Sequence, residues 1–187
     1  MPLTNYKLGD LIEACDERNS NNELALQDVR GISTDKKFIE TKASMIGVSL
    51  TNYKIVKNNE FAYVADTSRR GDKIALAYND AGNSVLISSI YTVFKVAKPE
   101  LLLPNYLFMF FNRPEFDRLA RFNSWGSARE TFSWDDFCDT CISLPPLPIQ
   151  QKYVDVYTSM VSNGQEFLAK NVCPVLIKGS IEEGKSN

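Results

Sequence analysis

A proline-rich segment at residues 141–160, CISLPPLPIQQKYVDVYTSM, constrains the fold more than any other feature of the sequence. Pro145, Pro146 and Pro148 fix their own φ angles and hold the residues before them in extended geometry. A helix therefore cannot run into this segment from its N-terminal side. We predict that a strand ends here and that a new helix begins after Pro148.

The predicted helix carries apolar residues at alternating spacings of four and three, which is the spacing of a coiled-coil seam. These residues are Ile149, Tyr153, Val156 and Met160. A seam of this kind requires a partner helix. Because it spans only about two and a half heptads, a helix that packs on its own domain is the alternative. We expect a domain over residues 1–147 and a spacer or dimerisation helix with its tail over residues 148–187.

The composition excludes several classes of function. The chain of 187 residues carries a net charge of −2, so a surface that binds nucleic acid must be local. It contains no histidine, which removes Ser-His-Asp and Cys-His catalysis and most transition-metal sites. The first residues include Lys7 and no long apolar run, which predicts a cytoplasmic protein without a signal peptide or membrane anchor.

Hydrophobic periodicity alternates between short helical and strand patterns, which predicts an α+β fold. We expect a mixed, curved β-sheet with short helices, followed by a C-terminal helix of the coiled-coil type. The apolar run at residues 107–111 predicts a buried helix that starts at Pro104, rather than an exposed stacking surface. The other expected elements are helices over residues 6–17, after Pro114 and after the capping residue Ser133, and strands over residues 24–29, 45–56, 61–65, 74–78, 84–96 and 138–144.

Three basic, turn-rich segments are candidates for contact with DNA. Arginine side chains grip phosphates or donate paired hydrogen bonds to a guanine edge, and lysines neutralise phosphates. Segment 123–131, NSWGSARET, adds hydroxyl groups, a flat tryptophan face and a glycine that allows close approach. Each segment also has a plainer interpretation as a solvated loop. The selected residues are Arg69, Arg70 and Lys73 in segment 66–73, Ser127 and Arg129 in segment 123–131, and Lys36, Lys37 and Lys42 in an exposed basic loop at residues 31–42.

Cys138 and Cys141 form a C-x-x-C pair. A zinc site would need further ligands, and the chain offers only Cys15 and Cys173 besides, with no histidine. A redox motif would open a helix after a strand, whereas this pair precedes an extended proline-rich run. We expect structural cysteines and no metal site.

Five segments follow one another along the chain: YKLGDLIE, NYKIVKNNEFAYV, KIALAY, SSIYTVFKV and ISLPPLPIQQKYV. In this order they resemble the specificity (S) subunits of type I restriction-modification systems. The resemblance covers about residues 5–165 and corresponds to one target recognition domain with the start of its helical spacer.

This resemblance implies a non-catalytic subunit that reads half of a split DNA target, while its helical spacer docks modification subunits. The implied partners are double-stranded DNA, modification (methyltransferase) subunits and the restriction subunit. S-adenosylmethionine, ATP and Mg²⁺ are expected in those partner subunits, and no cofactor is expected in this chain. The sequence agrees, since it contains neither a glycine-rich S-adenosylmethionine loop after a strand nor an Asn-Pro-Pro-aromatic or Asp-Pro-Pro-aromatic motif.

Members of this family usually contain two recognition domains and two long helices, whereas this chain carries one domain and a shortened helix. Two copies could pair through the seam of Ile149, Tyr153, Val156 and Met160, so that a two-fold reader meets two half-sites. The alternative is that the chain is a fragment of a longer subunit.

Two functions of other classes stay open. The chain could be a protein-docking module that acts through its C-terminal helix without touching DNA. It could also be a Mg²⁺-dependent nuclease, with Asp28, Glu40 and Lys42 as a carboxylate, carboxylate and lysine set.

Overall fold

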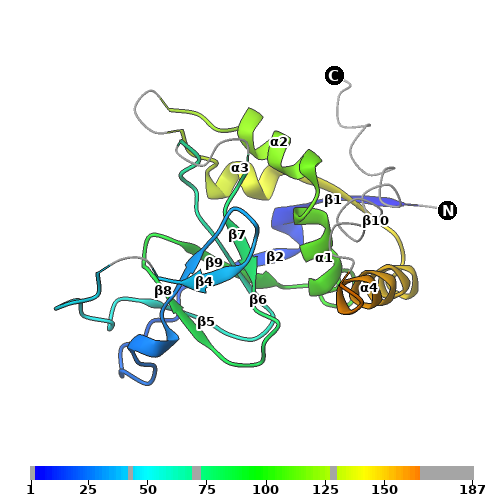
Figure 1. Cartoon of the computed structure of the whole chain (residues 1–187). Coiled ribbons are helices and arrows are strands. Elements are labelled where there is room, and N and C mark those ends of the chain that lie inside the picture. The colour runs from blue at the N-terminus through cyan, green and yellow to red at the C-terminus, as the bar shows by residue number, and fades with distance from the viewer. Residues whose placement is uncertain (1–2, 42–43, 69–72, 127–129, 165–187) are drawn as a thin grey trace.

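The computed structural model describes residues 3–41, 44–68, 73–126 and 130–164. Its helices are α1 (Pro104–Phe111), α2 (Pro114–Phe122), α3 (Trp134–Asp139) and α4 (Leu147–Ser162), with short 3-10 turns at Leu8–Asp10 and Leu26–Asp28. A four-stranded antiparallel sheet contains, in spatial order, β2 (Ile12–Cys15), β9 (Thr92–Val96), β6 (Glu60–Tyr63) and β7 (Leu76–Tyr78). The remaining strands pair two by two and antiparallel: β1 (Thr4–Lys7) with β10 (Cys141–Leu144), β3 (Arg30–Ile32) with β4 (Phe38–Glu40), and β5 (Lys54–Val56) with β8 (Val85–Ile87). In Figure 1 most strands gather on one side of α1 and α2, whereas β1 and β10 lie on the other side toward the N-terminus, and α4 lies beside α1.

The predicted α+β class is confirmed, and several local signals act as expected. Pro104 and Pro114 each stand in the first turn of their helix, where a missing N–H group costs nothing. Ser133 caps α3, because its hydroxyl accepts a hydrogen bond from the Asp136 N–H group at 3.1 Å. The strands expected within residues 45–56, 61–65 and 74–78 correspond to β5, β6 and β7.

Three local predictions are wrong. Residues 6–17 do not form a helix, because β1 pairs with β10 and β2 pairs with β9, so strand pairing with distant segments overrides the helical spacing. Residues 24–29 do not form a strand, since a 3-10 turn occupies Leu26–Asp28. Residues 84–96 form two strands in different sheets, separated by a turn in which the Tyr91 N–H group donates to the Ser88 carbonyl.

The core lies between the four-stranded sheet and the helices, and aromatic rings fill it. Phe61 stacks on Phe94 with ring centroids 5.0 Å apart, and Tyr63 stacks on Phe137 at 4.7 Å. The ring of Phe111 packs edge-on against Phe61. All five side chains are fully buried. The apolar run in α1 is core as predicted, since Leu107, Met109 and Phe110 are buried beside Phe111. Rings in these geometries add favourable pair energy to their buried area.

Helix α4 packs on its own domain through Gln150 and Val154, which are both buried. This packing face differs from the predicted seam, although one seam residue, Tyr153, also contacts the core and lies beside the Tyr106 ring. Val156 is 44% exposed. The predicted coiled coil and the boundary at residue 147 stay predictions. No helix within the described stretches is both long and apolar enough to cross a membrane.

Candidate nucleic-acid interface

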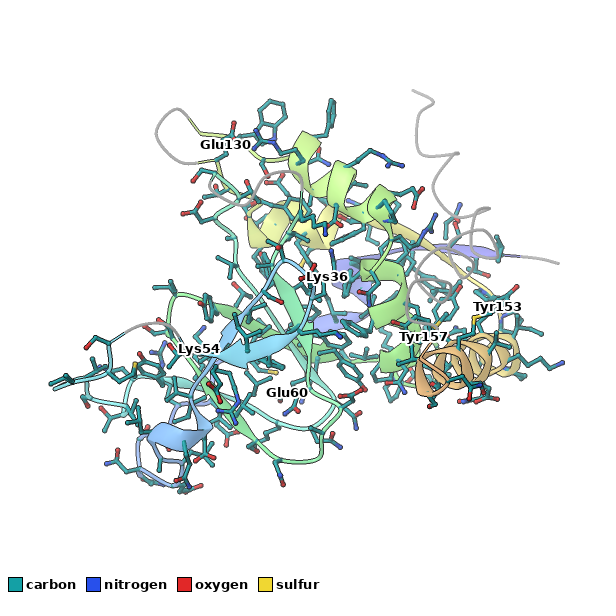
Figure 2. The ribbon with its side chains drawn as sticks, in the orientation of Figure 1. Lys36, Lys54, Glu60, Glu130, Tyr153 and Tyr157 are labelled. Atoms are coloured by element: carbon teal, nitrogen blue, oxygen red, sulfur yellow. The ribbon has the colours of Figure 1, made fainter. Side chains whose placement is uncertain are left out.

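Two of the predicted recognition segments, 66–73 and 123–131, are joined by backbone hydrogen bonds. Asp66 and Thr131 form an antiparallel bridge. The Glu130 carbonyl accepts hydrogen bonds from the Thr67 N–H group at 2.9 Å and from the Thr67 hydroxyl at 3.1 Å. In Figure 2 Glu130 lies at one end of the molecule, far from Tyr153 and Tyr157 on α4. The fold therefore places the described residues Asp66 and Thr67 beside Glu130 and Thr131, at the end of the molecule away from α4.

Two backbone hydrogen bonds join Trp125 to Thr131 in the second segment, and we call this pair of residues the neck. The N–H group of Trp125 donates to the carbonyl of Thr131 at 3.1 Å, and the N–H group of Thr131 donates back at 3.0 Å. Gly126 follows with φ at 138°, a conformation that glycine adopts readily and other residues rarely adopt. This neck leaves the Trp125 side chain 64% exposed.

A stripe of cations and aromatic rings runs along the outer face of α2 to this neck. We call it the α2 stripe, and it consists of Arg118, Arg121, Phe122 and Trp125. Arg121 and Phe122 follow Arg118 by three and four residues, so the three share one face of the helix. The opposite face is buried through Phe116, Asp117 and Ala120.

The stripe offers both charge and flat apolar surface. Phe122 is 70% exposed, although burying such a side chain typically stabilises by about 1.5–3 kcal/mol. Arg118 pairs with Glu115 at 3.2 Å, and Arg121 pairs with Glu130 from the neighbouring segment. Arginines beside aromatic faces are suited to phosphates and unstacked bases.

Phe122 belongs to the α2 stripe but is not among the contact residues predicted from the sequence. The available signal was its place beside Arg118 and Arg121 on the polar face of a helix whose other apolar residues lie on the opposite side.

Lys36 is not exposed, and this part of the sequence prediction is wrong. Its side chain is 4% exposed, and its Nζ atom lies 2.6 Å from Asp117 Oδ1 on α2. The burial follows from the tight turn between β3 and β4, in which Lys36 adopts φ of 60° and its N–H group donates to the Ser33 carbonyl. Lys36 in this position presents no exposed ammonium group to a phosphate.

Asp117 also fixes the second end of segment 66–73. Its Oδ1 atom accepts a hydrogen bond from the Ile74 N–H group at 3.1 Å. The neighbouring Lys73 is exposed, and its Nζ atom lies 3.5 Å from Asp35 Oδ1 in the β3–β4 turn. The described ends of the segment are thus held at Thr67 by Glu130 and at Ile74 by Asp117.

The other predicted contact residues divide into two groups. Lys37 is exposed in the β3–β4 turn, as predicted. A larger group lies outside the described residues, and its roles stay predictions: Arg69, Arg70, Ser127, Arg129 and Lys42.

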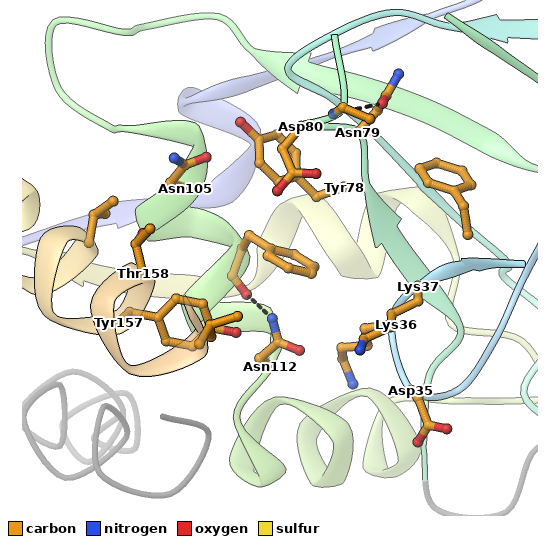
Figure 3. A pocket seen from close by; sticks show the side chains of 15 residues that line it. Asp35, Lys36, Lys37, Tyr78, Asn79, Asp80, Asn105, Asn112, Tyr157 and Thr158 are labelled. Atoms are coloured by element: carbon orange, nitrogen blue, oxygen red, sulfur yellow. Dashed lines mark hydrogen bonds between the residues drawn. The ribbon is translucent and has the colours of Figure 1, made fainter. Parts of the chain in front are cut away.

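A groove of about 400 Å³ separates the β3–β4 turn and the end of β7 from α1 and α4 (Figure 3). Lys37 and Asp80 line one wall, and Asn105, Asn112 and Tyr157 line the other. Asn112 is held in place because its Nδ2 atom donates to the Phe108 carbonyl at 2.9 Å. The groove offers a polar rim with aromatic walls, which suits a partner surface.

Burial keeps two of the described thiols from ionising easily. Burial, followed by the charge of Glu60, raises the pKa of the Cys15 thiol to about 11, which keeps it protonated at neutral pH. Burial also raises the pKa of Cys138. Asp28, from the nuclease alternative, caps a 3-10 turn by accepting from the Ala25 N–H group. Among the described residues, no three Cys, Asp or Glu side chains gather as metal ligands would.

Comparison with family models and with curated proteins found no match for this sequence. Solved structures do match. The HsdS subunit from Thermoanaerobacter tengcongensis is 19% identical, with a TM-score of 0.58 over 88% of this chain. The type I restriction-modification system S subunit from M. genitalium is 8% identical, with a TM-score of 0.53 over 86% of this chain.

This chain spans 43% of the first of these subunits and 39% of the second. The fold that the sequence resemblance implied is therefore confirmed: the chain has a fold shared with S subunits of type I restriction-modification systems, over less than half of each subunit's length.

Proposed function

We propose that this chain reads double-stranded DNA as a recognition domain of a type I restriction-modification S subunit. The observation that carries the proposal is the joining of segments 66–73 and 123–131 beside the α2 stripe. Both segments contain arginines in their sequences, and the described α2 stripe beside them supplies hydrogen-bond donors and flat aromatic faces. The fold shared with S subunits supports the same function.

In this proposal the chain performs no chemistry. It directs modification and restriction subunits to a split target, and those partners bind S-adenosylmethionine, ATP and Mg²⁺. Two copies meet through the outer face of α4, where the seam residue Val156 is exposed. Lys37 and Lys42 lie at the edge of the DNA contact and neutralise phosphates.

Salt-dependent binding of the full chain to a fluorescent duplex of random sequence tests DNA recognition. Removing both charges in the Arg69→Ala, Arg70→Ala variant lowers the slope of log affinity against log salt by about 1.8, if each arginine holds one phosphate. If the arginines read bases instead, affinity for random duplex changes little and discrimination among sequences falls. The variant Lys98→Gln, Lys152→Gln is the matched control, since it removes two exposed charges outside the proposed interface.

An unchanged slope together with unchanged discrimination in the arginine variant would remove segment 66–73 from the interface. If the wild-type chain itself binds no duplex in low salt, the proposed function fails.

A docking role without DNA contact is the second candidate. The groove between α1, α4 and the β3–β4 turn favours it, because a surface with aromatic walls and a polar rim fits another protein. Sedimentation of the chain with its co-encoded methyltransferase subunit separates the two functions. The docking role is favoured if the wild-type chain does not bind DNA and two variants form the methyltransferase complex as well as the wild type does. These variants are Trp125→Ala and the double change Arg69→Ala, Arg70→Ala.

A further inference from the structure

We propose that the buried ion pair between Lys36 and Asp117 is a positioning pair for DNA discrimination. It fixes the β3–β4 turn and the backbone at Ile74 to α2, so that Lys37, Lys73 and the α2 stripe meet DNA in one geometry. The inference rests on the proposed function and assigns it two residues that touch no DNA themselves.

The geometry of the pair joins three parts of the chain at a single oxygen atom. Asp117 Oδ1 lies 2.6 Å from Lys36 Nζ and 3.1 Å from the Ile74 nitrogen. Lys36 is 81 residues away from Asp117 in sequence, and Ile74 is 43 residues away. A shift of α2 would therefore move the turn and the segment together.

The burial of the pair points to a role in geometry rather than in stability. The side chains of Lys36 and Asp117 are 4% and 11% exposed. Removing two charges from water offsets most of the attraction between them, so a buried pair is seldom worth more than an apolar pair of the same size. In this pair, the cost of leaving either charge buried and unpaired favours a single arrangement of the β3–β4 turn, α2 and Ile74.

The position of the pair relative to the α2 stripe links it to recognition. Asp117 immediately precedes Arg118 on α2, with its side chain on the buried face. The other end of segment 66–73 is held by Thr67 and Glu130, and Glu130 also pairs with Arg121 of the stripe. Thr67 and Ile74 are thus attached to α2 or to its neighbour, and the Lys36–Asp117 pair extends this connection to the β3–β4 turn.

The test uses selection from a randomised duplex library with the full chain, followed by sequencing of the bound fraction. The variants are Lys36→Met, Asp117→Asn and the combination of both. Either single change leaves a buried polar partner unmatched, so it lowers the melting temperature. The combination leaves no buried charge and melts above Lys36→Met. The Asp117→Asn change keeps a side-chain oxygen that accepts from the Ile74 N–H group.

We expect the wild-type chain to enrich a short fixed motif. The combined variant binds the unselected library as tightly as the wild type, with the same salt slope, but discriminates among sequences about tenfold less, the amount that one well-read base pair supplies. The control is Lys7→Met with Asp139→Asn, which removes an exposed Lys–Asp pair of nearly equal length, 2.7 Å, between β1 and the end of α3. This control keeps the wild-type motif and enrichment.

Equal enrichment of the wild-type motif by the combined variant overturns the positioning role and leaves the proposed function standing. A wild-type chain that enriches no motif overturns both.

Hydrogen exchange of Asp117→Asn, without DNA, gives a second measurement if the combined variant does not fold. We expect faster exchange in peptides that cover residues 33–38 and 73–76 together. Faster exchange in only one of them contradicts the linkage.

Discussion

Gln150 provides the sharpest prediction about stability, because it is a fully buried polar side chain at the start of α4 with every donor and acceptor engaged. Its Oε1 atom accepts from the Leu103 N–H group at 3.0 Å. Its Nε2 atom donates to the carbonyls of Leu101 at 2.8 Å and Pro145 at 2.9 Å. The side chain thereby attaches α4 to the loop before α1 and to the proline segment.

Gln150→Ala removes three hydrogen bonds and leaves their backbone partners unpaired. Each bond contributes a net 0.5–1.5 kcal/mol, so the free energy of unfolding falls by about 3 kcal/mol. For a chain of this size that lowers the melting temperature by roughly 6–12 °C. Gln150→Leu keeps the side-chain volume and loses the same bonds, so a similar drop in both variants assigns the effect to hydrogen bonding rather than to a cavity.

Thermal unfolding followed by circular dichroism measures the effect, with Gln151→Ala as the matched control. Gln151 is exposed, and its bond to Asp155 on the helix surface contributes about 0.2–0.5 kcal/mol. If Gln150→Ala melts within about 2 °C of Gln151→Ala, the hydrogen bonds do not carry the attachment of α4 and the reasoning is refuted.

Three further predictions concern single sites. Trp125→Ala changes the unfolding free energy by less than about 0.5 kcal/mol, because the side chain is mostly exposed. It weakens binding of duplex DNA by about 1–3 kcal/mol if the ring stacks on a base. Equal DNA affinity of the variant and the wild type would exclude the Trp125 ring from the DNA contact. Gly9→Ala lowers the free energy of unfolding by about 1–3 kcal/mol, since the new Cβ atom would lie 2.9 Å from the Cys138 Cβ atom. A urea titration measures the change, and an unchanged unfolding midpoint would contradict this packing. At pH 8 iodoacetamide modifies the exposed Cys141 much faster than Cys15, because the Cys15 thiol stays protonated until the pH approaches its pKa of about 11. Mass spectrometry of the two peptides measures the ratio of the two modification rates. Equal rates would contradict the partial burial of Cys15.

The parts of the fold that sequence predicts well are those governed by neighbours in sequence. Proline at the first turn places the starts of α1 and α2, and the Ser133 hydroxyl with Asp136 three residues later places α3. These signals act within one helical turn, so no knowledge of the tertiary structure is needed.

The parts that sequence predicts poorly depend on distant partners. Leu8, Leu11 and Ile12 show a helical spacing, but the strands that include or flank them pair with β10 and β9, which lie far along the chain. The burial of Lys36 depends on Asp117, and a lysine in a turn-rich loop gives no local sign of such a partner. The buried face of α4 likewise includes Gln150, a polar residue that a hydrophobic pattern assigns to solvent.

The candidate site shows the same division. Its basic segments are visible in the sequence as clusters of Arg and Lys around turn residues. Their contact through Thr67 and Glu130 joins residues 63 positions apart, and periodicity carries no information at that separation.

Tryptophan fluorescence of the Trp134→Phe variant tests the central claim most directly, because Trp125 is then the single tryptophan of the chain. Trp134 stacks on Phe137 in the core, whereas Trp125 stands exposed at the neck of the second recognition segment. We predict that random-sequence duplex DNA quenches the Trp125 emission, shields it from iodide, and does so less strongly as salt concentration rises. Duplex DNA that binds the chain without altering this emission, or that does not bind at all in low salt, would contradict the placement of the DNA interface at this end of the molecule.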